Sequence, residues 1–515
     1  GYTAWSGKTT GNTVNIGDGT AATLAAGTNL DNAVLYGGNR ADDVTGNTLN
    51  VMVKDAKAQK AQNFENYTFH LTDHIAVDKP SSGTIDDTFT QNTGTMLTLA
   101  NGFDGQTADW NKVTVDTSKL SADKTLGAIT LMKSTAANKL KFSNYAAKNH
   151  AVSGDYEVVQ RTDTNTGEAN AVLIDVNRFR NGEVVYDGVN PNAKTYSGVS
   201  YGGNTAEKNT LTITGIASGK TVKYLSGGRS EGVAGGAVNN TVNLVGTGAG
   251  TLEEVYGGYI GKTTNSANAT GNTVNIAGGT VAKNIYAGYT NGTGKTTGNT
   301  VNLGDGEHSL AAGTNITGTI HGGNKADDAG NTLNVKTNAT AGNIKNFESI
   351  KLTLKSGAFN PANSLLRLTG GAQTTDLDWS KLEVDATTLA AAPKSYEAYR
   401  VKLMENANGI SFMKGATNTY ASLGAKERTQ GDLEYVIDTD NHTANAANSV
   451  DLEAYQFRNK QNAAFTAADG TKAEAWGGRT KVGNKVQNNK LTLTGGSATL
   501  VARGGLVSNT ELDAH

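Results

Sequence analysis

Residues that could form a catalytic site are scattered along this chain. The seven histidines lie at positions 70, 74, 150, 308, 321, 442 and 515, and no His-Glu-x-x-His zinc motif occurs. A serine protease would need a nucleophilic serine close to a histidine and an aspartate, and no Gly-Asp-Ser-Gly stretch is present. We therefore predict that the protein has no catalytic residues and needs no cofactor.

Adjacent aspartates are the next candidates for chemistry. They occur twice in matching loops, as Asp42, Asp43, Asp327 and Asp328. A retaining glycosidase needs two carboxylates held about 5–5.5 Å apart, whereas aspartates in glycine-flanked loops are typical of turns. Calcium can bind oxygen-rich loops, although the chain has no Gly-Gly-x-Gly-x-Asp array. We interpret the pairs as turn formers and keep calcium binding as an alternative.

Three short segments carry two aromatic residues three positions apart: Tyr2…Trp5, Tyr256…Tyr259 and Tyr286…Tyr289. At equivalent places in successive repeats, Tyr259 would lie over Tyr289, and the first ring of each pair would lie over the next. Such ring pairs contribute about 0.5–1.5 kcal/mol, so one interpretation is that they stabilise the repeats. The alternative is that the second ring is exposed and binds sugars or another molecule. The candidate binding residues are Trp5, Tyr259 and Tyr289.

The elements that would position these residues repeat along the chain. Each repeat has a glycine-containing corner and then, after a polar loop, a short strand such as Asn-Thr-Val-Asn-Ile. The corners begin at Tyr36, Tyr201, Ser226, Tyr256, Tyr286, His321, Trp476 and Arg503. The strands begin at Asn12, Asn47, Asn209, Asn240, Asn272, Asn299, Asn331 and Asn489. Alternation within each strand predicts one buried and one exposed face.

A repeat of about 20–50 residues is the signature of solenoids, propellers or arrays. The patterns of helical repeats are missing, and a propeller blade needs about 40 residues with four strands. We predict an all-β fold, a right-handed parallel β-helix with protruding loops and β-hairpins. Four apolar side chains should stack inside adjacent coils, namely Val274, Ile276, Val301 and Leu303. The strand asparagines should stack as well and form hydrogen-bonded ladders.

The chain also contains a longer duplication that includes several of these repeats. "GGNRADDVTGNTLNV" (37–51) matches "GGNKADDAGNTLNV" (322–335), and "DWNKVTVD" (109–116) matches "DWSKLEVD" (378–385). In the segment between corners, "YEVVQ" and "AVLIDV" flank a polar loop, which predicts a β-hairpin. Phe64 and Phe347 should be buried at equivalent places.

These patterns predict five parts. They are β-helix coils at 1–51, wider coils with a hairpin at 52–185, coils at 186–335, a second copy of the wider coils at 336–460, and coils at 461–515. Separate small β domains are the alternative for the two wider segments. Since the sequence opens and stops within repeats, we expect it to be a fragment whose coils continue beyond residue 515.

Composition excludes several classes of protein. The net charge is −2 with no basic stripe, which removes an electrostatic case for nucleic-acid binding. The absence of cysteine excludes disulfides and thiolate metal sites, and no run of 18 apolar residues could span a bilayer as a helix. The 64 glycines and only 4 prolines, together with short β-branched runs, favour ordered, turn-rich β structure.

The coils resemble a known family. "VYGGY", "GNTVNI", "IKNFESIKLTL" (344–354) and "DWSKLEVD" are similar to the passenger region of autotransporters, the type V secreted proteins of diderm bacteria. The resemblance implies a right-handed parallel β-helix, export across the inner and outer membranes, and display on the cell surface through a C-terminal β-barrel that this sequence does not contain. Many such passengers are adhesins.

We therefore expect a bacterial cell-surface adhesin or stalk without catalytic activity. It would bind host or bacterial surface components, either glycan or protein, or itself, through the side of a β-helical rod. Nucleic acid is not an expected partner, and membrane attachment would come only from the barrel. The alternatives are a structural extracellular filament or surface-layer subunit, and a glycan-degrading β-helix enzyme.

Overall fold

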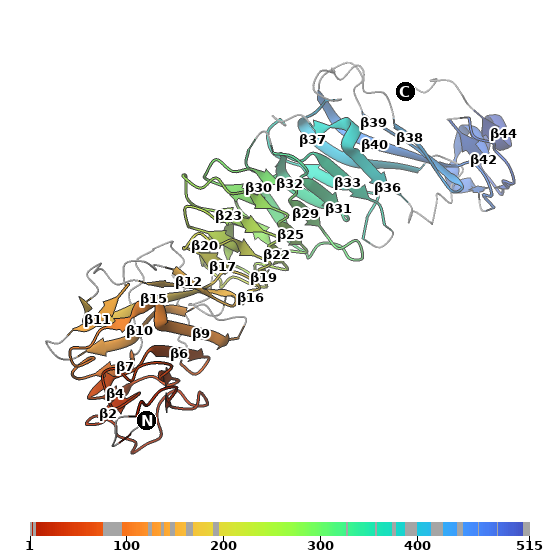
Figure 1. The fold of residues 1–515 in the computed structure, drawn as a ribbon. Helices are drawn as coiled ribbons and strands as arrows, with labels where there is room; N and C mark the ends of the chain where they lie inside the picture. The colour runs from red at the N-terminus through yellow and green to blue at the C-terminus, as the bar shows by residue number, and fades with distance from the viewer. Residues whose placement is uncertain are drawn as a thin grey trace. The chain divides into compact units, whose positions relative to one another are not determined.

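The computed structural model describes Thr3 and residues 7–75, 95–121, 126–134, 139–144, 150–160, 168–188, 195–325, 328–355, 358–372, 377–386, 399–413, 426–439, 446–461, 463–481 and 483–507. In these ranges the chain forms β-strands and short 3-10 turns and no α-helix (Figure 1). None of the described residues belongs to a helix long and apolar enough to cross a membrane. The predicted all-β class is confirmed.

The chain divides into two compact units. Unit 1 comprises Gly1–Val242, Tyr256–Asn272 and Gly288–Lys295, and unit 2 comprises Asn243–Val255, Thr273–Ala287 and Thr296–His515. Three strands have residues in both units: β22 (Thr241–Leu244), β23 (Thr251–Ile260) and β27 (Ile285–Thr290). Each unit is described by itself.

Two sheets, one parallel and one mixed, form most of the first half of unit 1. One has the order β1 (Thr13–Ile16), β3 (Thr48–Val51), β6 (Asn66–Thr72), β9 (Val113–Lys119). The other begins β4 (Ala56–Ala58), β7 (Thr95–Leu99), β10 (Leu126–Ser134). It then continues antiparallel through β15 (Ala171–Arg178), β13 (Tyr156–Gln160) and β12 (His150–Ser153). The β13–β15 pair is the hairpin predicted from sequence.

Unit 1 contains further strand pairs, most of them parallel. The pairs are β2 (Val34–Tyr36) with β5 (Lys60–Gln62), β8 (Ala108–Asp109) with β11 (Leu140–Ser143), β16 (Glu183–Tyr186) with β19 (Thr210–Ile213), and β17 (Tyr196–Ser200) with β20 (Thr221–Ser230). β14 (Glu168–Ala169) joins β11 antiparallel, and β18 (Ala206–Glu207), β21 (Ala237–Val238) and β24 (Ala269–Thr270) stack parallel.

Unit 2 repeats this plan. Figure 1 shows the neighbouring strands of its first parallel sheet, β25 (Thr273–Ile276), β29 (Thr300–Leu303), β31 (Thr332–Val335), β33 (Ser349–Thr353) and β36 (Leu382–Asp385). The second sheet runs parallel through β26 (Thr280–Val281), β30 (Asn315–His321), β32 (Ala339–Lys345), β34 (Leu366–Leu368) and β37 (Tyr399–Met413). β40 (Ala446–Gln456), β39 (Leu433–Thr439) and β38 (Lys426–Gln430) then follow antiparallel. Two further parallel pairs are β41 (Ala463–Phe465) with β43 (Leu491–Leu493) and β42 (Thr471–Thr480) with β44 (Ser497–Val507).

The buried side of the coils follows the predicted register. Val274 pairs with Val301 and Ile276 with Leu303, and all four side chains are buried. Burial of such side chains stabilises the fold by about 1.5–3 kcal/mol each. Stacked parallel strands with an apolar interior confirm the predicted β-solenoid.

The chain makes a turn at the residue before each strand asparagine. This residue has a positive φ at Gly46, Lys208, Asn239, Gly271, Gly298, Gly330 and Asn488. Glycine adopts this conformation without steric cost, and asparagine adopts it more readily than most residues. The recurrence of Gly-Asn and Asn-Asn at the strand starts therefore has a backbone cause.

The second glycine of the corner makes room for the same asparagine. A Cβ at Gly228 would overlap the amide of Asn240, and a Cβ at Gly258 would overlap the amide of Asn272. The same relation holds for Gly478 with Asn489, and for Gly198, which pairs with Gly228 in the register of β17 and β20, with Asn209. The corner and the strand therefore recur together because one packs directly against the other.

The buried asparagines form the expected ladder. In unit 1, Asn209 Nδ2 donates to Asn240 Oδ1 at 2.8 Å, and Asn240 Nδ2 donates to Asn272 Oδ1 at 2.9 Å. The backbone N–H groups of Asn209 and Asn240 donate to the same two oxygens. All three side chains are fully buried, so these bonds satisfy polar groups that would otherwise be costly to bury.

A second ladder runs along the outward side of the strands. In unit 2, Asn275 donates to Asn243, Asn302 to Asn275 and Asn334 to Asn302, at 2.7–2.8 Å. These side chains are only partly buried. The strand sequence Asn-Thr-Val-Asn therefore supplies one inner and one outer ladder residue.

Candidate binding site

Tyr259 and Tyr289 stack as the repeat predicts. Tyr259 lies at the end of β23 and Tyr289 at the end of β27, their ring centroids are 5.4 Å apart, and the rings are nearly parallel at 3°. Both side chains are partly exposed. Trp5, the third candidate, lies outside the described residues, as does its partner Tyr2.

An arginine continues the stack from the preceding coil. The guanidinium of Arg229, on β20, lies 5.0 Å from the ring centroid of Tyr259. The backbone N–H of Gly261 donates to the Ser230 carbonyl at 2.8 Å, so the two segments are adjacent. We call Arg229, Tyr259 and Tyr289 the tyrosine column. Because a neighbour from each adjacent coil covers Tyr259, this ring presents its edge and hydroxyl to solvent.

Buried groups hold Arg229 in place. Its side chain is 7% exposed, forms an ion pair with Glu231, and donates to the Tyr224 hydroxyl at 3.0 Å. Burial alone would lower the pKa of Arg229, but the charge of Glu231 and the contact with Tyr224 raise it above its usual value. A Cβ at Gly261 would overlap the Glu231 carboxylate, so glycine leaves room for this pair.

Asn291 joins the two tyrosine hydroxyls at the rim. Tyr289 donates to Asn291 Oδ1 at 3.1 Å, and Asn291 Nδ2 donates to the Tyr259 hydroxyl and to the Gly261 carbonyl, each at 3.1 Å. Burial raises the pKa of Tyr259, so its hydroxyl stays protonated near neutral pH. The rim is thus a fixed row of hydrogen-bonding groups above an aromatic stack.

The first ring of one corner, Tyr256, lies deeper than the column. Tyr256 is buried and meets Tyr259 and Tyr289 edge-on, with centroid distances of 5.0 and 5.2 Å. In unit 2, Tyr286 stacks on His321, which occupies the same corner position in the next coil, at 4.4 Å and 17°. Edge-on and offset ring contacts are favourable geometries, so Tyr256 supports Tyr259 and Tyr289 from below.

Asp43 and Asp328 bind residues of the preceding coil. Asp43 is buried and accepts from the Thr9 hydroxyl at 2.9 Å, while Asp42 is exposed beside Arg40. Asp328 accepts from the backbone N–H of Thr296 at 2.7 Å. Asp327 lies outside the described residues. Among the residues that the structure describes, no group of three or more His, Asp or Glu side chains could hold a metal ion.

A Gly-x-Ser-x-Gly stretch does occur, at residues 198–202, and sequence reasoning missed it. This pattern can mark the nucleophile of an α/β-hydrolase when it connects a strand to a helix. Here Ser200 is fully buried at the end of β17, and its hydroxyl donates to Glu157 at 2.8 Å. A buried hydroxyl held by a carboxylate contributes to packing and is not exposed as a nucleophile.

Sequence reasoning also missed Arg229 and Asn291. The signal for Arg229 was available, because Ser-Gly-Gly-Arg at 226–229 aligns with Tyr-Gly-Gly-Tyr at 256–259. Asn291 had no such signal, since its role depends on where the loop after β27 places its amide.

Comparison with known proteins identifies no relative of this chain. No family model, no curated protein and no solved structure matches it. Functional conclusions therefore depend on the fold and the side chains themselves.

Proposed function

We propose that the chain is part of an autotransporter-type bacterial surface protein whose β-solenoid serves as an adhesive stalk. It binds glycan or protein components of host or bacterial surfaces, or a second copy of itself, through the lateral surface of its coils. It is exported across both bacterial membranes, is displayed outside the cell, and catalyses no reaction.

The tyrosine column is the observation that carries this proposal. Its aromatic rings are fixed by stacking, by the Arg229–Glu231 pair and by Asn291, while Tyr259 and Tyr289 remain partly exposed. Tyrosines supply contact area and hydrogen bonds at low cost in conformational entropy. A solenoid presents such groups at a fixed spacing from coil to coil, which suits attachment to an extended surface.

The test compares two double variants of the purified chain. Tyr259→Ala with Tyr289→Ala removes the stack, while Tyr259→Phe with Tyr289→Phe keeps the stack and removes the hydroxyls bonded to Asn291. We expect both to bind host-cell or bacterial layers more weakly, with the phenylalanine variant retaining the parent unfolding temperature. Unchanged binding by the alanine variant would contradict the proposal. Binding lost only in parallel with thermal stability would leave the column a purely stabilising feature.

A further inference from the structure

An irregularity in β37 opens a cavity in unit 2. Glu405 of this strand pairs with Ser449 of β40, yet Ile410 already pairs with Ala447. Residues 406–409 therefore lie opposite the single residue Asn448, and Gly409 has φ 101° within this bulge. Bulges redirect side chains and are common beside functional sites.

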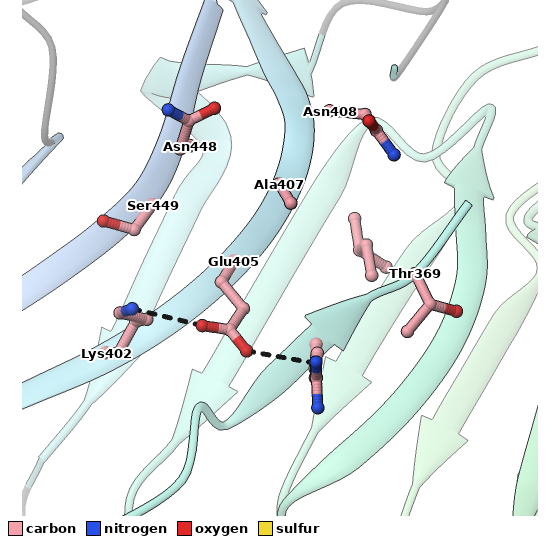
Figure 2. Close-up of a pocket in the computed structure, with 9 residues that line it drawn as sticks. Thr369, Lys402, Glu405, Ala407, Asn408, Asn448 and Ser449 are labelled. Carbon is pink, nitrogen blue, oxygen red and sulfur yellow. Dashed lines mark ion pairs between the residues drawn. The ribbon is translucent and has the colours of Figure 1, made fainter. Parts of the chain in front are cut away.

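The cavity beside the bulge is polar and holds about 400 Å³. This volume lies within the range of about 300–1,000 Å³ found for small-molecule sites. Figure 2 shows Glu405 near its centre, with Lys402 on the same strand, Asn448 and Ser449 on the neighbouring strand, and Asn408 and Thr369 across from them. The remaining lining residues are Arg367, Leu368 and Ala407.

Three charged side chains form a row across the cavity. Glu405 pairs with Arg367 Nε at 3.3 Å and with Lys402 Nζ at 3.1 Å. Burial would raise the pKa of Glu405, but the bond from Lys402 and the nearby cations lower it below its usual value. The side chains of Arg367 and Lys402 are 64% and 47% exposed, so their charged groups face solvent and can reach a ligand.

The first copy of the duplicated segment lacks this row. In the second copy, Arg367 of β34 pairs with Glu405 of β37. In the first copy, Thr98 of β7 pairs with Lys133 of β10, so Thr98 takes the place of Arg367 and Lys133 takes the place of Glu405. The antiparallel pairing places Thr130 where Lys402 lies and Ala171 where Ser449 lies. The row of charges is thus not required to form this part of the solenoid.

We infer that this cavity binds a saccharide ring that carries a carboxylate. Arginine and lysine are donors, Glu405 is an acceptor, and the asparagine amides are both, a mixture that matches vicinal sugar hydroxyls. Two cations against one carboxylate favour an acidic ring, and the arginine fork can bind a carboxylate with two bonds. Asp451 lies beside the lining, opposite Lys402 in the register of β37 and β40, and accepts from Ser449 at 2.6 Å.

This site is distinct from the tyrosine column, so its test does not depend on adhesion. Calorimetric titration of the full chain would use methyl glucuronide as the probe, with methyl glucoside and acetate as comparisons. We expect the glucuronide to bind more tightly than either. Arg367→Thr and Lys402→Thr introduce the residues of the first copy and should each weaken binding at least about tenfold. Lys351→Thr removes an exposed cation paired with Glu383 elsewhere on the unit and should bind like the parent.

Several outcomes would overturn the inference. The inference fails if the glucuronide does not bind, or if methyl glucoside binds equally well. Equal binding of acetate would mark an anion site only. Unchanged glucuronide binding by Arg367→Thr would also contradict it. Unfolding curves accompany each variant. If Arg367→Thr does not fold, Lys402→Thr provides the same comparison.

Discussion

Both carboxylate oxygens of Glu157 accept a hydrogen bond from the backbone N–H of Gly202, each at 3.1 Å. Glu157 belongs to the hairpin strand β13, and Gly202 to the corner of the coil that follows. Glu157 also accepts from the Ser200 hydroxyl and the backbone N–H of Tyr201, and in the second copy Glu434 of β39 accepts from the Thr480 hydroxyl and the backbone N–H of Lys481 in the same way. Both glutamates are fully buried, and each attaches a hairpin to the next coil.

Glu157→Gln and Glu434→Gln should each lower the free energy of unfolding by about 2–3 kcal/mol. The amide nitrogen of glutamine would point its N–H groups at the N–H and O–H donors that the carboxylate now accepts from. Chemical denaturation measures the loss, and limited proteolysis should show earlier cleavage around the affected hairpin. Glu183→Gln, at an exposed glutamate of β16, is the matched control. Variants as stable as that control would show that the carboxylates do not hold the hairpins.

The inner and outer asparagine ladders should differ in their contribution to stability. Asn240→Ala leaves the buried donors of Asn209 without their acceptor, and we expect a loss of about 2–3 kcal/mol. Asn302→Ala, on the partly exposed outer ladder, should cost less than about 1 kcal/mol. Equal losses in urea denaturation would contradict the distinction between the two ladders.

Val301→Asp should unfold its neighbourhood locally. Val301 is fully buried between Val274 and Leu333 of the adjacent strands, and an unpaired buried charge costs about 3–5 kcal/mol. Hydrogen exchange should accelerate in β25, β29 and β31. Thr300→Asp places the same charge on the outward side of β29 and should leave exchange in these strands nearly unchanged.

Acid should weaken the corner that contains His321. Burial, with a smaller effect of Lys345, lowers the pKa of His321 to about 4 from 6.5. The unfolded chain therefore binds the proton more readily, so this contribution to stability is complete above pH 6.5 and falls as the pH drops towards 4. The loss amounts to at most about 3 kcal/mol.

The variant His321→Tyr can keep the stack on Tyr286 without the titrating group. Its unfolding free energy should depend less on pH between 6.5 and 4 than that of the parent chain. Identical pH profiles for the two chains would show that another group causes the acid sensitivity.

Local repetition explains what could be predicted from sequence. The strand alternation placed Val301 and Leu303 inside, and the corner spacing placed Tyr259 on Tyr289, because both relations depend only on the step between coils. Glu157 could not be paired with Gly202 in the same way, since that contact joins residues 45 positions apart through a hairpin. The bulge in β37 was also missed, because it arises from a register mismatch between two strands that sequence patterns do not specify.

The inner asparagine ladder has a direction. The donors of Asn209 are satisfied by an oxygen of Asn240, and those of Asn240 by an oxygen of Asn272, so each coil is completed by the one that follows it in the chain. A formed coil therefore presents an N–H and an amide as a template for the asparagine of the next coil. The two sides of a coil are therefore chemically different at this position: the side towards the following coil carries the ladder donors, and the side towards the preceding coil carries the acceptor oxygen.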